Sequence, residues 1–354
     1  MMLTRRLFAG GLLLLPWGRA ALSAAAADLP ATIRFGDVGF GFGTPFGVGI
    51  SAIADAKGFV AEEFKDTEVK LEFTYFTNTG PAINEAFANG QLDFAAYGAV
   101  PNVIGKANGL PTKIILSYGG TNIFGAARTD LSIKTVADLK GKRVAIQKAT
   151  IIHWGLLHAL QAYGLTENDI TIVDLKNADQ LAALAAKSVD AVFGASFVLP
   201  LRDKGLANII YRSSDLGATA TGFGAIVVTE EFAHKYPEAT QRVARGFLKA
   251  AAWLARKENR AEAFSIWSRT GTPVALYQAE FEGQDLKEAF NPLLDDFFRS
   301  RYRSVIAFDR EQKLIRTDVD LGKWIDGEIA DKALGGLGLA DFWPRRRDDG
   351  TAVK

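Results

Sequence analysis

The segment VADLKGKRVAIQKATIIH, residues 136–153, decides the fold and shows where to look for function. Its central residues, 143–146, form a predicted strand that ends in a polar turn, and a helix is predicted to begin near Thr150. Free backbone amides at the start of a helix hold the positive end of its dipole, which favours an anionic ligand. Thr150 and His153 are therefore candidate ligand-binding residues, although His153 is equally consistent with a partly buried structural histidine.

Short strands and helices alternate on both sides of this segment, which predicts an α/β fold with mostly parallel, doubly wound sheets. A long helical stretch from Glu230 to about Ala333 follows the second α/β unit, so we expect one lobe to be interrupted by the other. The predicted strands are 32–38, 69–75, 92–96, 113–117, 143–146, 170–175, 191–193, 208–211 and 223–228. The predicted helices between them are 47–57, 81–88, 101–107, 153–163 and 179–186. We expect the chain to cross between lobes near 118–124 and 220–225.

Other strand-to-helix turns supply further candidate residues, because ligands of parallel sheets collect at the carboxyl ends of the strands. The loop GFGFGTPFG, residues 39–47, presents its phenylalanines either to a ligand or to the core. The turn TNTGP, residues 77–81, either binds a ligand or only caps the following helix. The candidates from this reasoning are Phe42, Thr44, Thr79 and, in the turn after the strand 191–193, Ser196.

Composition excludes several function classes. The 354 residues are 48% apolar and have a formal net charge of +1, so the surface has no overall attraction for nucleic acid or anionic membranes. There is no cysteine, which excludes disulfides, thiolate nucleophiles and cysteine-ligated metals. With three histidines and neither a G-x-S-x-G nor a G-K-[ST] motif, the chain offers no pattern for a metal site, a cofactor or catalysis.

The first 27 residues predict an export signal. Arg5 and Arg6 precede a short apolar run and then a small-residue stretch, and the run is too short to span a membrane. The arginine pair resembles a twin-arginine (Tat) signal, and an ordinary Sec signal is the alternative. Loss of these residues, which contain three arginines and no acid, would leave a formal charge of −2. We therefore expect a protein that is free in the periplasm after cleavage.

The ordered set of motifs resembles the periplasmic solute-binding proteins of the nitrate, sulfonate and taurine group, the NMT1/THI5-like family. Residues 136–145 are similar to that family's ADLKGKKVAV segment, and 148–153 to its KGS-x-x-H. GPAINEA (80–86) with NGQLDF (89–94) resembles its GP-x-x-x-EAL and G-x-x-D-F motifs, and KSVDA (187–191) its G-x-VDA. The resemblance extends from about Ile33 to Trp267.

The resemblance implies a two-lobed type II binding protein with two hinge crossings, which delivers a small ligand to a membrane ABC permease. It implies a site that includes Gly80, Pro81, Thr150 and His153. The expected domains are an export signal at 1–27, a discontinuous first lobe at 28–120 and 223–340, a second lobe at 121–222, and a charged, frayed tail at 341–354.

Departures from the family pattern concern the ligand. Ala149 replaces the motif glycine and Thr150 its serine, while FGASF (193–197) replaces a tryptophan-containing turn. These changes leave room for a bulkier or more aromatic ligand than a simple alkanesulfonate. Since no arginine lies in a matched turn, we expect a monoanion rather than a doubly charged oxyanion.

The leading hypothesis is a monomeric, non-enzymatic solute-binding component of an ABC importer, with a sulfonate-, taurine- or nitrate-like ligand. There are two alternatives. The protein could be a periplasmic sensor component, or its ligand could be a pyrimidine that is a thiamine precursor. An enzyme on the same fold is opposed by the absence of cysteine.

Overall fold

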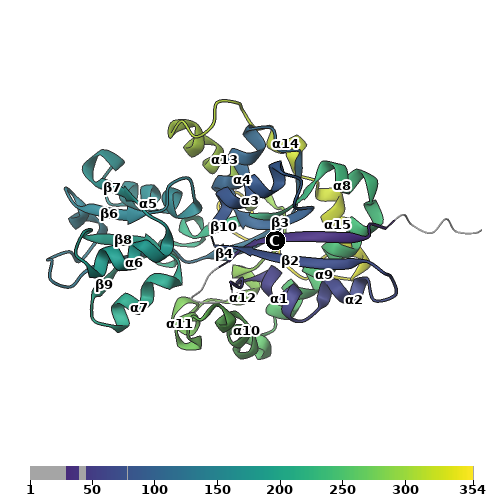
Figure 1. Cartoon of the computed structure of the whole chain (residues 1–354), viewed down its shortest axis with the longest axis horizontal. Helices are drawn as coiled ribbons and strands as arrows, with labels where there is room; N and C mark the ends of the chain where they lie inside the picture. The colour runs from purple at the N-terminus through teal and green to yellow at the C-terminus, as the bar shows by residue number, and fades with distance from the viewer. Residues whose placement is uncertain (1–28, 40–44, 78, 354) are drawn as a thin grey trace, which may run out of the picture.

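The computed structural model describes residues 29–39, 45–77 and 79–353, so the predicted signal lies outside the described residues. Two five-stranded sheets lie side by side along the long axis of the molecule, each covered by helices (Figure 1). We refer to the sheets with their packed helices as the first and second lobes. The α/β fold with two helix-flanked sheets is confirmed.

The first sheet has the strand order β2-β1-β3-β10-β4. Its strands are β1 (Thr32–Val38), β2 (Lys70–Phe76), β3 (Phe94–Gly98), β4 (Thr112–Thr121) and β10 (Gly222–Thr229). β1 pairs in parallel with β2 and β3, whereas β10 is antiparallel to both β3 and β4. The sheet is therefore mixed, although all strands except β10 share one direction.

The second sheet repeats this arrangement in the order β7-β6-β8-β5-β9. Its strands are β5 (Phe124–Arg128), β6 (Arg143–Ile146), β7 (Thr171–Asp174), β8 (Ala191–Gly194) and β9 (Ala207–Arg212). Here β5 is the reversed strand, antiparallel to β8 and β9. β5 was not among the expected strands; its sequence FGAAR lacks the alternation of large apolar and polar residues that marks a strand.

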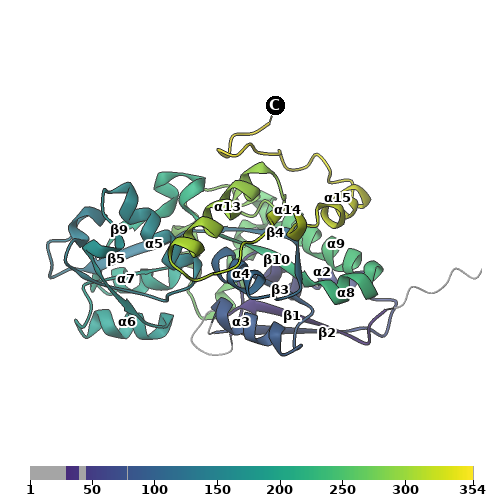
Figure 2. The same ribbon diagram turned by 90° about the horizontal axis from the view of Figure 1, so that it is seen from above.

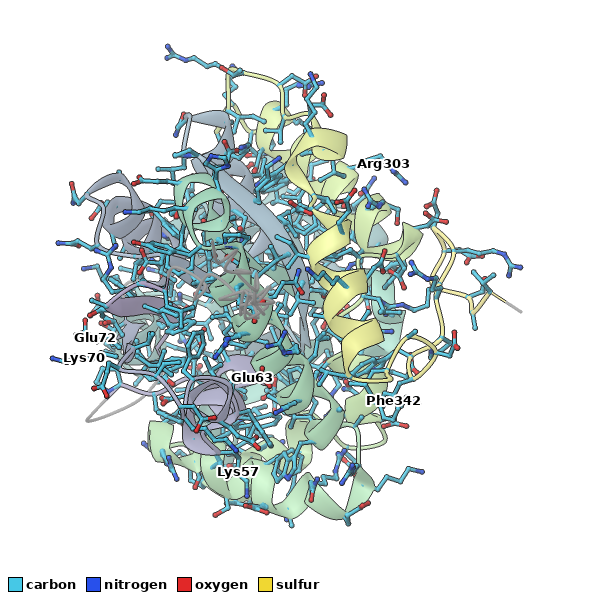
Figure 3. All side chains as sticks on the ribbon, turned by 90° about the vertical axis from the view of Figure 1, so that its right-hand side faces the viewer. Lys57, Glu63, Lys70, Glu72, Arg303 and Phe342 are labelled. Atoms are coloured by element: carbon cyan, nitrogen blue, oxygen red, sulfur yellow. The ribbon has the colours of Figure 1, made fainter. Side chains whose placement is uncertain are left out.

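Exposure along the strands follows their position in the sheet. Every residue of β3, in the middle of the first sheet, is buried. In the edge strand β2, Lys70 and Glu72 are exposed, and Figure 3 shows both at the outer margin of the lobe. Charged side chains on an edge strand oppose pairing with another chain.

Helices cover both faces of each sheet. In the first lobe, the helices before the crossing are α1 (Ile50–Ala56), α2 (Phe59–Glu63), α3 (Thr79–Ala88) and α4 (Ala99–Ala107). The second lobe contains α5 (Ile151–Ala162), α6 (Asn177–Ala185) and α7 (Leu199–Asp203). The long helix α9 (Pro237–Leu254) packs on α1, α2 and α15, which closes one face of the first sheet.

The remaining helices follow β10 in the sequence. They are α8 (Glu230–Lys235), α10 (Arg260–Trp267), α11 (Val274–Glu280), α12 (Leu286–Ala289), α13 (Asp296–Glu311), α14 (Leu321–Trp324) and α15 (Gly327–Gly336). Figure 2 shows α13, α14 and α15 along one side of the first lobe, followed by the tail. The tail has defined contacts, contrary to the expected fraying: Trp343 is buried, and Arg346 pairs with Asp295 at 2.8 Å. None of the helices in the described ranges is long and apolar enough to cross a membrane.

One helix near the end of the chain packs on the second lobe. Leu276 of α11 is buried in the same apolar cluster as Val198, Leu199 and Leu201. Glu280, at the end of α11, accepts a hydrogen bond from the Thr121 hydroxyl at 3.0 Å and, through its backbone carbonyl, one from Asn122. The helix therefore joins the second lobe to the segment in which β4 leads to β5.

Candidate ligand-binding site

All the strands that share a direction in each sheet, except β9, end at one cavity with a volume of about 90 Å³. Residues at or just after the carboxyl ends of β1, β2, β3 and β4 line it from the first lobe, and residues after β6, β7 and β8 from the second. The described lining residues are Asp37, Val38, Val48, Thr79, Gly80, Gly98, Pro101, Tyr118, Gly120, Thr121, Gln147, Thr150, Ile151, Ile152, Asn177, Ala195, Phe197, Phe281 and Phe290.

Four helices begin at this cavity. α3 starts at Thr79, α4 follows Gly98, α5 follows Thr150, and α6 starts at Asn177. Among the described residues, no side chain caps the first-turn amides of α4, α5 or α6; the Thr150 hydroxyl donates instead to the Gln147 carbonyl at 2.7 Å. Uncapped helix starts leave backbone N–H groups free and add the positive ends of their dipoles. Both lobes therefore supply donors for a negative group.

Several polar side chains in the wall also lack partners. The Thr79 hydroxyl is buried without a hydrogen bond to any described residue. Among the described residues, the side-chain amides of Gln147 and Asn177 also have no hydrogen-bond partner, and both residues are half-buried. Thr79 also has a φ of 60°, a conformation that costs energy for a β-branched residue. Unpaired groups on a strained turn are typical of a ligand site.

Asp37 is a lining residue that the sequence did not point out. It is 6% exposed, and its carboxyl accepts hydrogen bonds from the Ser51 hydroxyl and from the Val38 amide. Burial raises its pKa to about 8, and the two hydrogen bonds only partly oppose this rise. At neutral pH Asp37 is therefore mostly protonated and can donate a hydrogen bond into the cavity.

No lysine or arginine is among the described residues of the wall. A bound anion would be held by amides, hydroxyls and helix dipoles rather than by a guanidinium or ammonium group. Aromatic rings close the remaining wall: Tyr118 of β4, Phe197 after β8, and Phe281 and Phe290 from the C-terminal part of the chain. In the described ranges, no group of acidic residues and histidines could hold a metal ion.

The structure brings together some of the predicted residues. Thr79, Gly80 and Thr150 line the cavity, and Gly80 is required for close packing because a Cβ there would lie 2.2 Å from Pro101 Cγ. Pro81 follows in α3 but is not in the wall. Phe42 and Thr44 lie outside the described residues.

Ser196 and His153 lie behind the wall. Ser196 sits between the lining residues Ala195 and Phe197, and its side chain hydrogen-bonds Glu280, a buried acid whose pKa burial raises to about 7. His153 is 2% exposed and packs edge-to-face on Phe308 of α13, with ring centroids 5.4 Å apart. Burial lowers the pKa of His153 to about 4, so the ring is neutral at pH 7.

The two lobes are in contact next to the cavity. Ile151 and Trp154 of α5 belong to the large apolar cluster of the first lobe, and the Trp154 ring lies edge-to-face on Phe223 of β10. Trp154 therefore packs between the lobes and is absent from the described wall of the cavity.

Comparisons with known proteins identify the family and agree with the fold. The sequence profile of the family described as NMT1/THI5 like matches residues 49–261. The chain belongs to the NMT1/THI5-like family. It is 28% identical, over 80% of its length and 84% of the relative, to a candidate aliphatic sulfonates-binding protein of Bacillus subtilis. It is 26% identical to the taurine-binding periplasmic protein of Escherichia coli, over 55% of this chain and 63% of that protein.

A solved structure with the same fold was found. It is the periplasmic sulfonate-binding protein of a candidate sulfonate ABC transporter from Methylobacillus flagellatus, with a TM-score of 0.80 and 26% identity. The match covers 91% of this chain and 99% of that one. The resemblance to periplasmic binding proteins is thereby confirmed.

The departure at Ala149 from the pattern of the NMT1/THI5-like family has a structural meaning. Ala149 has a φ of 55°, in the left-handed region that glycine enters without a steric penalty. The turn therefore has a backbone shape that a glycine would adopt without strain; Ala149 adopts it at a cost in stability, and Thr150 lines the cavity.

Proposed function

We propose that the protein is the solute-binding component of an ABC importer and captures a small organic monoanion of the sulfonate class in the cavity between the lobes. The protein is not an enzyme in this proposal. It works in the periplasm, as an exported monomer that presents its closed form to a membrane permease. The relatives that bind aliphatic sulfonates and taurine support this substrate class.

The observation that supports an anionic ligand most directly is the meeting of uncapped helix starts from both lobes at a cavity without a lysine or arginine in its described wall. A sulfonate has three acceptor oxygens and one charge, so it can accept several amide and hydroxyl hydrogen bonds at once. Backbone donors fixed by helices lose little entropy on binding. A doubly charged anion would need a lysine or arginine to compensate its second charge, and the described wall contains neither.

Asp37 supports the same substrate class in its protonated form, as a donor to a sulfonate oxygen. The same carboxyl offers a partner for an ammonium group, because ionised Asp37 can pair with an amine. Taurine, which has both groups, therefore fits the wall with its sulfonate at the helix starts and its amine at Asp37.

We also propose that the lobes act as two hinged domains, 28–120 with 223–340 and 121–222, with 1–27 as a cleaved export signal and 341–354 as the tail. The β4–β5 and β9–β10 connections provide the two hinges. Hinge closure about a ligand buries it and creates a surface that a permease can distinguish.

A thermal-shift screen tests the proposal. The probes are ethanesulfonate, taurine, nitrate, acetate and a thiamine-precursor pyrimidine, each against sodium chloride at equal ionic strength. A ligand that binds only the folded protein raises Tm with concentration. We expect the sulfonates to raise Tm; a shift with the pyrimidine alone would contradict the proposed substrate class.

A matched pair of variants locates the binding. Asn177→Ala removes an amide from the cavity wall, whereas Asn208→Ala makes the same change at an exposed position of the same lobe. We expect the first variant to weaken ethanesulfonate binding by about tenfold, as for loss of one hydrogen bond to a charged group, and the second to leave it unchanged. Equal affinities of both variants, measured by calorimetry, would place the ligand elsewhere.

A further inference from the structure

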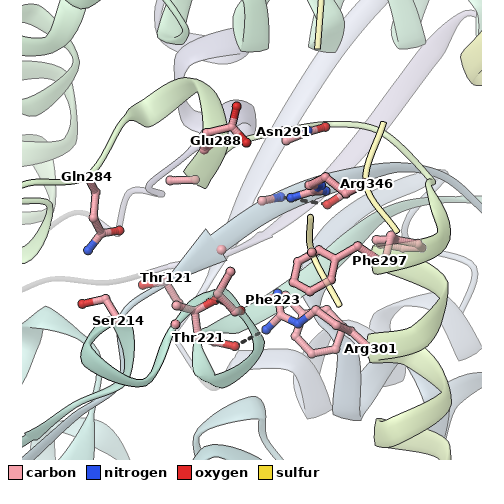
Figure 4. A pocket seen from close by; sticks show the side chains of 18 of the residues that line it. Thr121, Ser214, Thr221, Phe223, Gln284, Glu288, Asn291, Phe297, Arg301 and Arg346 are labelled. Carbon is pink, nitrogen blue, oxygen red and sulfur yellow. Dashed lines mark hydrogen bonds between the residues drawn. The ribbon is translucent and has the colours of Figure 1, made fainter. Parts of the chain in front are cut away.

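A second and larger cavity lies where the chain crosses between the lobes (Figure 4). Its volume is about 310 Å³. The end of β4, the segment 214–223, the region from α12 to α13 and the tail all contribute to its wall. It shares only Gly120 and Thr121 with the described wall of the ligand cavity, so the end of β4 separates the two spaces. We call it the hinge cavity.

Arg301 of α13 forms the base of the hinge cavity. The residue is 9% exposed, and its guanidinium lies 3.7 Å from the ring centroid of Phe223. Nη2 donates to the Thr221 carbonyl, as the dashed line in Figure 4 shows, and Nε is buried without a partner in the described part of the chain. Within those residues, no carboxylate forms an ion pair with Arg301.

The ion pair next to Arg301 does not neutralise the charge of Arg301. Arg346 of the tail pairs with Asp295, whose side chain is 1% exposed. Phe297 lies between the two guanidinium groups, 5.4 Å from that of Arg301 and 4.8 Å from that of Arg346. Burial, followed by the charge of Arg346, lowers the pKa of Arg301 to about 9, which still leaves it charged at pH 7. One buried positive charge is therefore left over.

The residues around Arg301 indicate what kind of group would compensate its charge. A buried charge is costly unless it is paired. Asp285 and Glu288 also line the cavity, but both are exposed at its rim, and Asp285 caps α12. Beside the guanidinium, the wall is formed by phenylalanine rings and small residues, which suit an apolar group rather than a hydrated inorganic ion.

We propose that the hinge cavity is a second binding site, for a small organic monoanion whose charged end pairs with Arg301 and whose apolar part lies against Phe223 and Phe297. The site is spatially separate from the sulfonate cavity. Because its wall includes a residue beside each lobe crossing, Gly119 with a φ of 95° and Gly217 with a φ of 92°, an occupant contacts both hinges at once. Occupancy therefore changes the affinity of the sulfonate cavity by resisting hinge rotation.

The test measures the effect of sodium benzoate on Tm of the full chain, up to 100 mM and with sodium chloride at equal ionic strength as the control. Two variants remove the hinge site by different routes. Arg301→Leu deletes the charge, and Ala218→Trp fills the cavity from an exposed position of its wall without changing Arg301. If Arg301→Leu fails to fold, Ala218→Trp alone still decides the matter.

We expect benzoate to raise Tm of the wild type and of Asn177→Ala, and to lose that effect in Arg301→Leu and Ala218→Trp. Absence of a shift in the wild type at 100 mM would overturn the hinge site. A shift that persists in Ala218→Trp but disappears in Asn177→Ala would also overturn it, because benzoate would then occupy the sulfonate cavity. That second result would leave the proposed function standing.

Discussion

Replacement of Asp37 by asparagine tests the electrostatics of the ligand cavity. Asp37 is buried, receives hydrogen bonds only from Ser51 and Val38 in the described part of the chain, and has its pKa raised from 3.8 to about 8 by burial. Between about pH 4 and pH 8, Asp37 therefore keeps its proton in the folded protein, whereas the same side chain has lost its proton in the unfolded chain. Since the folded state binds more protons there, its stability must fall as pH rises across that interval.

The size of this pH-dependent change in stability follows from the pKa shift of Asp37. Each pKa unit corresponds to about 1.36 kcal/mol, so the free energy of unfolding that Asp37 contributes falls by about 4 kcal/mol between pH 5 and pH 8. Asparagine does not titrate, and Asp37→Asn should gain that amount relative to the wild type over the same interval. Urea denaturation at pH 5 and pH 8 measures the difference. A gain that is the same at both pH values would refute the reasoning.

A second buried acid provides the matched control. Asp309 of α13 is also buried, with its pKa raised to about 8, and it is not in the described wall of the cavity. Asp309→Asn should show a similar pH-dependent gain in stability without any change in ligand binding. In contrast, ethanesulfonate affinity should fall above pH 8 in the wild type and in Asp309→Asn, because ionised Asp37 repels the anion, and stay level in Asp37→Asn.

Three further predictions concern the turns around the cavity. Ala149→Gly should raise the free energy of unfolding by up to about 1 kcal/mol, because the left-handed backbone of Ala149 disfavours a Cβ; an unchanged urea midpoint would contradict this. Gly80→Ala should abolish ligand binding, because the new Cβ would meet Pro101 and displace the start of α3; calorimetry with full affinity would disprove the clash. Because burial lowers the pKa of His153 to about 4, the wild type should lose stability as pH falls below about 6.5, and His153→Phe should remove part of that loss; identical acid denaturation curves for the two proteins would count against it.

The local part of the site could be predicted from the sequence. The segment 136–153 and the turn at 77–81 show a strand followed by a helix, so the positions of Thr79, Gly80 and Thr150 follow from the carboxyl-end rule for parallel sheets. The turn after β8 was also placed at the cavity, although its lining residues are Ala195 and Phe197. These predictions depend only on residues that are close together in the chain.

The missed residues depend on contacts between distant segments. Asp37 lies inside a strand, and only its burial distinguishes it from a surface acid. Phe281 and Phe290 reach the cavity because the C-terminal helices return to the space between the lobes, and no local pattern specifies that path. β5 was missed because a central strand covered on both faces tolerates glycine and alanine, whose small side chains give no periodic signal.

The position of α11 determines which parts of the protein can move as one body. Leu276 of α11 lies in the apolar cluster of the second lobe, whereas Tyr277 and Phe281 are buried in that of the first, so α11 contacts both lobes and the continuous segment 121–222 does not contain every residue that packs in the second lobe. A fragment that contains only residues 121–222 would lack Leu276. It would therefore expose apolar surface at Val198 and Leu199 and should aggregate when expressed alone. Fluorescent labels intended to report lobe separation should therefore avoid α11, since a dye placed there would sit on a helix that packs against both lobes.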